Sequence, residues 1–155
     1  MRKWVIWLIS VVGIELTGII SGFFAGDIQS IYQQLQKPPL SPPGSIIGTI
    51  WTIIYALMGT ALFLLIVSKV SKKMKASAIT LFAIQQILNF SWSILFFGGN
   101  HYWIATLVII VLIALIIFCM RVFYYINKAA SFLFAPYLIW CLYAGYLCLG
   151  LAILN

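Results

Sequence analysis

Five apolar stretches, each long enough to cross a bilayer, occupy most of this chain and limit what it can fold into. A hydrocarbon core about 30 Å thick needs roughly 20 apolar residues in helical form. Hydrocarbon offers the backbone no hydrogen-bond partner, and these runs lack the alternation of a barrel strand, so each should be a helix. We therefore predict an all-α membrane protein, a five-transmembrane-helix bundle forming one domain over residues 1–155. The predicted spans are Trp4 to Phe24, Ile46 to Val67, Ala76 to Phe97, Tyr102 to Met120 and Ala129 to Leu154.

Composition supports a membrane protein, because 65% of the 155 residues are hydrophobic and only 7% are charged. A soluble domain of that composition would expose large apolar areas to water. The first stretch could instead be a secretory signal, since Arg2 and Lys3 give it a basic start. We favour a retained helix, because the run is too long for a signal sequence, is interrupted by Glu15 and is followed by no clear cleavage site.

Basic residues are concentrated on one predicted side of the membrane. The opposite side carries Lys37 alone, with Asp27 nearby. Lysine and arginine near span ends are retained in the cytoplasm, so we expect a plasma-membrane protein with a cytoplasmic N-terminus and an external C-terminus. The net charge of +7 then reflects topology and anionic lipid rather than nucleic acid. The basic side carries Arg2, Lys3, Lys69, Lys72, Lys73, Lys75, Arg121 and Lys128.

The longest connection, residues 25–45, has its own pattern. Apolar side chains at i, i+3, i+4 and i+7 predict a short amphipathic helix with Asp27 as its cap. The prolines of the following segment, Pro38 to Gly44, impose an extended and rigid backbone. We expect this connection to lie across one mouth of the bundle, either as a lid over a cavity or as a plain interfacial connector. The apolar positions are Ile28, Ile31, Tyr32 and Leu35.

Polar side chains within spans are costly and therefore informative. Glu15 lies near the middle of the first span, where it could contact a ligand or a proton, or could be a neutral acid bonded within the bundle. Gln85, Asn89 and Trp92 fall at i, i+4 and i+7 and predict a polar and aromatic stripe that faces the bundle interior. The alternative is a purely structural role, in which the polar side chains form hydrogen bonds between helices. Glycines at every fourth position, Gly18 and Gly22 among them, predict a close helix contact.

Aromatic side chains gather on three of the spans. Trp140 lies about midway along the last span, whereas tryptophans of an interfacial belt lie near the ends of spans. Any one of these rings could simply be core packing, but the set favours a cavity for a large, flat, apolar ligand. The side chains concerned are Trp51, Tyr55, Phe90, Trp92, Tyr137 and Trp140.

Metal and conventional enzyme chemistry find little support. His101, the chain's one histidine, lies in a glycine-rich turn, and no His, Cys, Asp or Glu cluster is visible, so we expect no metal site and no cofactor. No nucleophile and base form a recognisable pair. The three cysteines fall within spans and should behave as small hydrophobic side chains.

Three segments carry a resemblance to a known family: Lys37 to Ala61 (KPPLSPPGSIIGTIWTIIYALMGTA), Leu88 to Gly98 (LNFSWSILFFG) and Pro136 to Asn155 (PYLIWCLYAGYLCLGLAILN). They resemble the translocator protein and tryptophan-rich sensory protein family (TspO/MBR), formerly the peripheral benzodiazepine receptor. The resemblance covers essentially the whole chain, and the proline-rich segment followed by Trp51 is its most specific part.

The resemblance implies a homodimer of five-helix bundles, each with a pocket under the first loop. The pocket would bind porphyrins, as ligands rather than cofactors, and isoquinoline or benzodiazepine-type drugs; sterols bind some members. Carried over by position, the ligand-binding residues would be Tyr32, Pro42, Pro43, Trp51, Asn89, Phe90, Trp92, Trp140, Cys141 and Ala144.

Three functions are compatible with that pocket. We favour a receptor or sensor. Some family members break down protoporphyrin under light, and here Trp51 and Trp140 would be the catalytic candidates. A transporter of porphyrin or sterol-like ligands is the third possibility, weakened by the lack of an inverted repeat. Leu40 and Ser45 replace large aromatic residues of many relatives, and no basic residue follows Lys128, which disfavours tight sterol binding.

Overall fold

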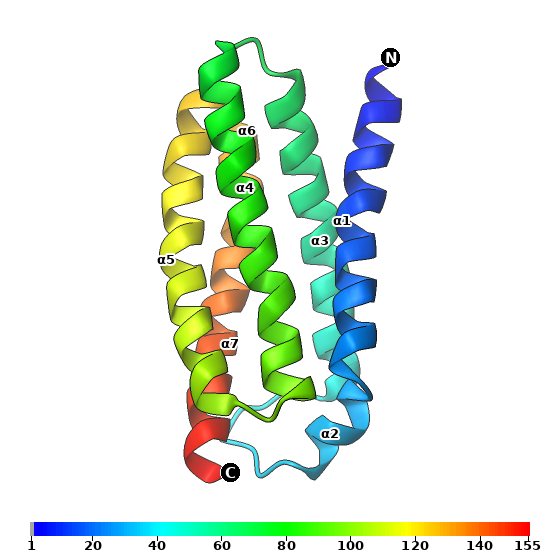
Figure 1. The fold of residues 1–155 in the computed structure, drawn as a ribbon, viewed down its shortest axis with the longest axis vertical. Coiled ribbons are helices and arrows are strands. Elements are labelled where there is room, and N and C mark those ends of the chain that lie inside the picture. Colours follow the sequence, from blue (N-terminus) through cyan, green and yellow to red (C-terminus); the bar gives the residue numbers. More distant parts are fainter. Residues whose placement is uncertain (1) are drawn as a thin grey trace.

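The computed structural model describes residues 2–155, and over that range it contains helices and no strand. Five helices are long and apolar enough to cross a membrane, which confirms the predicted five-helix bundle (Figure 1). The elements in chain order are α1 (Lys3–Ala25), α2 (Ile28–Gln34), α3 (Gly44–Val67), α4 (Lys72–Ser93) with a π-helical turn (Ile94–Gly98), α5 (Tyr102–Ile126), α6 (Lys128–Leu133) and α7 (Ala135–Leu154).

Most of the helices extend beyond the predicted spans. α4 begins at Lys72 instead of Ala76, and α5 continues to Ile126 instead of ending at Met120. The added turns carry lysine or arginine, whose long side chains reach water while the backbone stays helical. Hydrophobicity alone therefore marks the part of each helix within the hydrocarbon and misses its ends.

Side-chain caps fix several helix starts. Asp27 accepts from the backbone N–H of Ser30 at 3.2 Å, which confirms the predicted cap of α2. Ser71 caps α4 in the same way, through the N–H of Met74 at 3.2 Å. The predicted short helix in the first connection is therefore present as α2, while its role as a lid remains a prediction.

The last span is divided in two. α6 ends at Leu133, and α7 begins at Ala135 with Pro136 in its first turn, a position where proline's missing N–H costs nothing. The hydroxyl of Ser131 donates to the carbonyl of Met120 on α5 at 2.7 Å and anchors the break.

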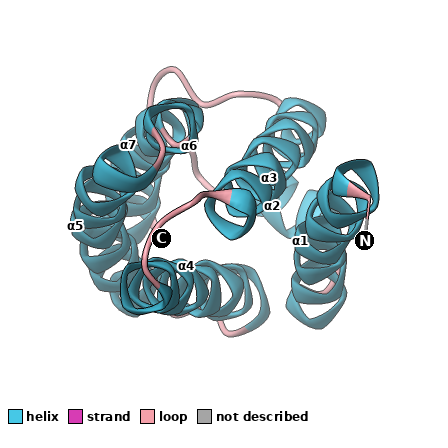
Figure 2. Cartoon of the chain, turned by 90° about the horizontal axis from the view of Figure 1, so that it is seen from above, coloured by secondary structure: helices cyan, strands magenta, loops and turns pink. Residues whose placement is uncertain are grey.

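Seen from above, the spans form a ring in the order α1, α3, α6 and α7, α5, α4 (Figure 2). The backbones of α1 and α3 approach each other near Gly59, where a Cβ atom would lie 2.5 Å from Cα of Val11 and 3.0 Å from the carbonyl oxygen of Ser10. In the same region the indole N–H of Trp7 donates to the hydroxyl of Thr60 at 3.1 Å. These contacts join α1 and α3 on the side of the membrane where α1 begins.

Candidate functional site

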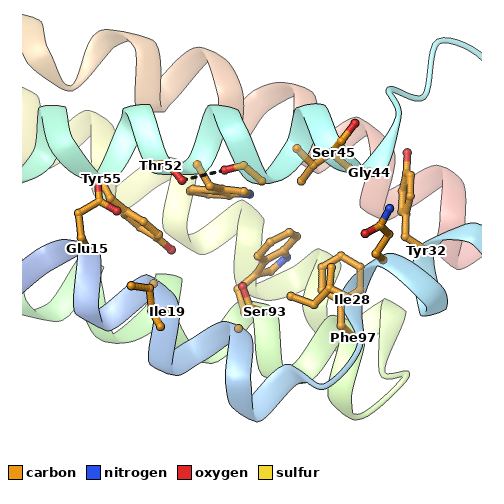
Figure 3. A pocket seen from close by; sticks show the side chains of 17 residues that line it. Glu15, Ile19, Ile28, Tyr32, Gly44, Ser45, Thr52, Tyr55, Ser93 and Phe97 are labelled. Atoms are coloured by element: carbon orange, nitrogen blue, oxygen red, sulfur yellow. Dashed lines mark hydrogen bonds between the residues drawn. The ribbon is translucent and has the colours of Figure 1, made fainter.

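A cavity of about 410 Å³ lies between α1 and α3, with α2 at one end and α4 behind it (Figure 3). Its volume is within the range of about 300–1,000 Å³ that small-molecule sites occupy. Polar side chains are few and lie mostly at its two ends, so an apolar ligand suits it. Its lining includes Glu15, Ile19, Ile28, Gln29, Tyr32, Ile47, Trp51, Thr52, Tyr55, Trp92, Ser93 and Phe97.

Glycines create much of this space. Gly18 and Gly22 of α1 and Gly44 and Gly48 of α3 all line the cavity. A Cβ atom at Gly48 would meet nothing within 4 Å, and one at Gly22 would meet only a side-chain carbon at 4.0 Å. Gly18 does make the close contact that its spacing predicted, against the ring of Tyr55. At Gly22 the same spacing accompanies an opening between the helices.

Trp51 is the centre of the aromatic wall. Its ring centroid lies 5.6 Å from that of Tyr55, 6.0 Å from that of Trp92 and 6.4 Å from that of Trp140. The rings are tilted or perpendicular to one another, which are the favourable arrangements for aromatic pairs. Trp51 is therefore held in place from several sides while one part of it faces the cavity.

A second, smaller pocket of about 30 Å³ lies behind Trp51 and Trp92, lined also by Trp140 and Ala144. In the part of the chain described here, the indole N–H groups of Trp92 and Trp140 are buried and have no hydrogen-bond partner. A buried donor without an acceptor costs about 1–3 kcal/mol. Both indole side chains border this pocket.

A buried hydrogen-bonded chain lies beneath the cavity. The Tyr55 hydroxyl donates to the side-chain oxygen of Asn89 at 2.7 Å, and the Asn89 amide donates to the hydroxyl of Tyr137 at 3.2 Å. Tyr137 in turn donates to the side-chain oxygen of Gln85 at 2.9 Å. Asn89 and Gln85 are at most 1% exposed. This chain joins α3, α4 and α7 by side chains alone.

The same chain continues to α1. The Gln85 amide donates to the side-chain oxygen of Gln86 at 3.3 Å, and the Gln86 amide donates to the hydroxyl of Thr17 at 2.6 Å. The Thr17 hydroxyl donates to the carbonyl of Ile14 at 2.7 Å. The predicted polar stripe of α4 thus takes part in bonding between helices, and Asn89 lies within that network.

A strap, residues 36–43, runs from the end of α2 across the end of the bundle and back to α3 (Figure 1). Contrary to the prediction, it is not extended throughout, because Pro39 and Leu40 form a turn in which Leu40 has a φ of 65°. Tyrosines of α7 hold its carbonyl groups. The Tyr143 hydroxyl donates to the carbonyl of Leu40, and the Tyr146 hydroxyl donates to that of Pro39 at 2.7 Å. The strap is therefore fixed to the helix opposite the cavity's α1 wall.

Two further contacts hold the strap. The side chain of Asn155 accepts from the N–H of Gln36 at 3.0 Å and donates to its carbonyl at 2.9 Å. Gly150 of α7 lets Pro38 pack against the helix, because a Cβ at Gly150 would come within 2.6 Å of the proline ring.

Tyr32 ties the other end of the strap to α2. Its hydroxyl donates to the carbonyl of Pro42 at 2.8 Å, and its ring is 3% exposed. Burial raises the pKa of the Tyr32 phenol above its ordinary value. The phenol therefore keeps its proton at neutral pH and remains a hydrogen-bond donor to the strap.

Removing both α7 hydroxyls is expected to loosen the strap. A Tyr143→Phe, Tyr146→Phe double variant loses two hydrogen bonds of about 1 kcal/mol each, so local opening should become at least about tenfold more frequent. Leu40 is 86% exposed, which makes Leu40–Ser41 a chymotrypsin site. The measurement is the rate at which the fragment ending at Leu40 forms. Tyr102→Phe, whose hydroxyl bonds Asn100 instead, is the control; equal rates in all three proteins would contradict the strap contacts.

The structure distributes the predicted site residues over several places. Tyr32, Trp51 and Trp92 line both cavities, whereas Trp140 and Ala144 line only the smaller one. Pro42 and Pro43 border a surface recess beside Tyr32. Asn89, Phe90 and Cys141 line neither cavity, and of these Asn89 and Cys141 are buried within the bundle.

Several cavity residues were not singled out from the sequence. Gly48 and Thr52 lack the charge or ring that draws attention to a binding residue. One signal was present: Gly44 and Gly48 have the same four-residue spacing as Gly18 and Gly22, so two helices each carry a strip of small residues. Two such strips facing one another can leave a cleft between helices.

A metal centre is not indicated for residues 2–155, where no group of three or more His, Cys, Asp or Glu side chains could hold an ion. His101 lies just before α5, close to Gly99.

Comparison with known proteins gives a consistent result. The TspO/MBR family model matches residues 8–154. The chain is 37% identical to the Tryptophan-rich protein TspO of Chlorobaculum tepidum, over 75% of this chain and 73% of that protein. It is 34% identical to the Tryptophan-rich protein TspO of Archaeoglobus fulgidus, over 94% of both chains. It is 31% identical to the Tryptophan-rich sensory protein of Cereibacter sphaeroides, over 70% of this chain and 66% of that protein.

Proposed function

The chain belongs to the TspO/MBR family of membrane proteins, and from this premise we propose that it is a receptor or sensor for a large, flat, apolar ligand of the protoporphyrin type. The observation that carries the proposal is the cavity of about 410 Å³ between α1 and α3, with Trp51, Tyr55 and Trp92 on its wall. Isoquinoline and benzodiazepine-type drugs are flat, aromatic and apolar, and we propose the same cavity for them.

The chemistry of the wall supports such a ligand. A macrocycle in the cavity would replace lipid contact with stacking on Trp51 and Trp92, and aromatic pairs contribute about 0.5–1.5 kcal/mol beyond the area they bury. The carboxylates of protoporphyrin would remain at the membrane surface. Lys37, whose ammonium group lies 5.0 Å from the ring centroid of Tyr32, is positioned at that end of the cavity.

Titration with protoporphyrin in the dark, followed by tryptophan emission, tests the proposal. We expect saturable quenching in the wild type and affinity about tenfold lower in Trp51→Phe, because that ring lines the large cavity. Trp140→Phe should weaken binding less, since Trp140 borders the smaller pocket and does not line the large cavity. Trp103→Phe, at a site 62% exposed to lipid, is the control. A wild type without saturable quenching would end the porphyrin proposal.

Light-dependent breakdown of the porphyrin is the second candidate. The perpendicular contact between Trp51 and Trp140 favours it, because two adjoining indoles can share the charge left by an electron passed to an excited porphyrin. Repeating the titration under light separates the two functions. Loss of porphyrin absorbance that requires Trp51 or Trp140 would indicate breakdown, and binding without such loss would indicate a receptor.

We place the protein in the plasma membrane with its N-terminus in the cytoplasm, on the basis of its Lys and Arg distribution. A homodimer is part of the same proposal and rests on the family alone. Transport of porphyrin or sterol-like ligands remains the less favoured alternative.

A further inference from the structure

A carboxyl group lies at the inner end of the large cavity. Figure 3 shows Glu15 beside Tyr55 at one end, with Tyr32 at the other. Glu15 is ten residues from Ala25, the end of α1, or about 15 Å along a helix that rises about 1.5 Å per residue. This distance is about half of a hydrocarbon core about 30 Å thick. The carboxyl therefore lies near the middle of the membrane.

Glu15 has no partner for its charge within the described chain. No side-chain hydrogen bond involves it, and the neighbouring donors are used elsewhere: Thr17 donates to the carbonyl of Ile14 at 2.7 Å and Tyr55 donates to Asn89 at 2.7 Å. Basic residues are also distant along the helix, since Lys3 is twelve positions away on α1. No Lys, Arg or His of residues 2–155 lines the cavity.

An ionisable side chain at this depth is expensive unless it is paired. An ammonium group would supply both the opposite charge and hydrogen-bond donors, and in a medium of low dielectric constant such a pair attracts strongly. Tyr55 lies beside Glu15 (Figure 3). Trp51 precedes Tyr55 by four residues, one helical turn of α3, and their ring centroids are 5.6 Å apart. Aromatic faces attract cations as well. The inner end of the cavity therefore combines an ionisable carboxyl group with aromatic rings.

We propose that this inner end binds the ammonium group of a lipophilic amine, with the apolar part of the amine lying along Trp51 and Trp92. The proposal rests on the proposed function only in using the same cavity, and it concerns a different ligand class. Glu15 is the specificity-determining residue, because it is the one charged side chain among those that line the cavity, and the rest of the wall would accept neutral and basic molecules alike. The partial exposure of Glu15 to the cavity leaves its carboxyl accessible to such a group.

The test compares 11-bromoundecylamine with 11-bromoundecanol, two probes that differ in the head group and carry a bromine that quenches tryptophan on contact. Both are titrated into the full-length protein in lipid nanodiscs. We expect saturable quenching by the amine at a concentration at least tenfold below that needed for the alcohol. Equal quenching by the two probes in the wild type would overturn the proposal without any variant.

Glu15→Gln is expected to remove the preference for the amine. Asp27→Asn is the matched control: it removes one carboxylate outside the membrane, and asparagine still caps α2. It should keep the preference, and a Glu15→Gln protein that keeps it as well would overturn the proposal. Infrared spectra of the wild type give a second readout, because the amine, but not the alcohol, should convert a neutral carboxyl band to a carboxylate band.

Protoporphyrin titration of the same proteins separates this proposal from the proposed function. A Glu15→Gln protein that unfolds at the wild-type temperature but has lost the amine preference supports the role of Glu15, because the loss is then not a folding defect. Wild-type protein that binds protoporphyrin without preferring the amine overturns the amine site and leaves the porphyrin receptor standing.

Discussion

A Gly59→Leu variant is expected to lose most of its stability, because α1 leaves no room for a side chain at this position. A Cβ atom there would lie 2.5 Å from Cα of Val11 and 3.0 Å from the carbonyl oxygen of Ser10. Both obstacles are backbone atoms, which cannot turn aside as a flexible side chain can. Overpacking usually costs about 1–3 kcal/mol, and we expect at least the upper end of that range here. Thermal unfolding in nanodiscs measures the loss.

Gly13→Leu is the matched control. Gly13 lies on α1, two residues from Val11, and a Cβ atom there would meet nothing within 4 Å. Its variant should unfold at about the wild-type temperature, since leucine at this site faces lipid. Equal unfolding temperatures for Gly59→Leu and Gly13→Leu would contradict the close crossing of α1 and α3.

The second large effect concerns ligand binding without loss of stability. Leucine at Gly48 would project into the large cavity, where a Cβ atom meets nothing within 4 Å. We expect Gly48→Leu to fold as stably as the wild type, because leucine is the better helix former by about 0.5–1 kcal/mol. Protoporphyrin affinity should fall at least tenfold, since the new side chain occupies the ligand's volume. The titration and a thermal unfolding curve test both parts.

Thr49→Leu provides the comparison for that variant. Thr49 is the next residue of α3, is exposed and does not line the cavity. It should leave protoporphyrin affinity unchanged. Normal affinity in Gly48→Leu would show that the ligand lies elsewhere, and the smaller pocket bordered by Trp140 would become the alternative site.

The five-helix bundle could be predicted from the sequence because the features that determine each helix lie within that helix. Length and hydrophobicity are enough to identify five spans, and Asp27 followed by an apolar stripe is enough to place α2. The packing of one helix on another could not be predicted in the same way. The glycine spacing of α1 identified a face at Gly18 and Gly22, but the α1 backbone comes closest to a glycine of α3 at Gly59. The spacing of glycines along one helix identifies a helix face, whereas a contact between helices also depends on the register of the two helices.

The site was predictable where a residue's chemistry is unusual for its surroundings. Tyr32, Trp51 and Trp92 stood out as aromatic residues and do line the large cavity. Asn89 could have been a ligand contact or a bond between helices, and only the position of Tyr137, 48 residues away, places it in a network. The contact of Asn155 with Gln36 spans 119 residues and leaves no local signal.

The buried chain from Tyr55 to Thr17 has one further property. Each of its members donates to the next in the same direction, and the last donates to the carbonyl of Ile14. Aligned bonds strengthen one another, but the amides of Asn89, Gln85 and Gln86 donate through nitrogen and accept through oxygen, so no proton can hop through them as it does along hydroxyls or water. The bundle thus carries a continuous polar chain through its interior that does not serve as a proton wire.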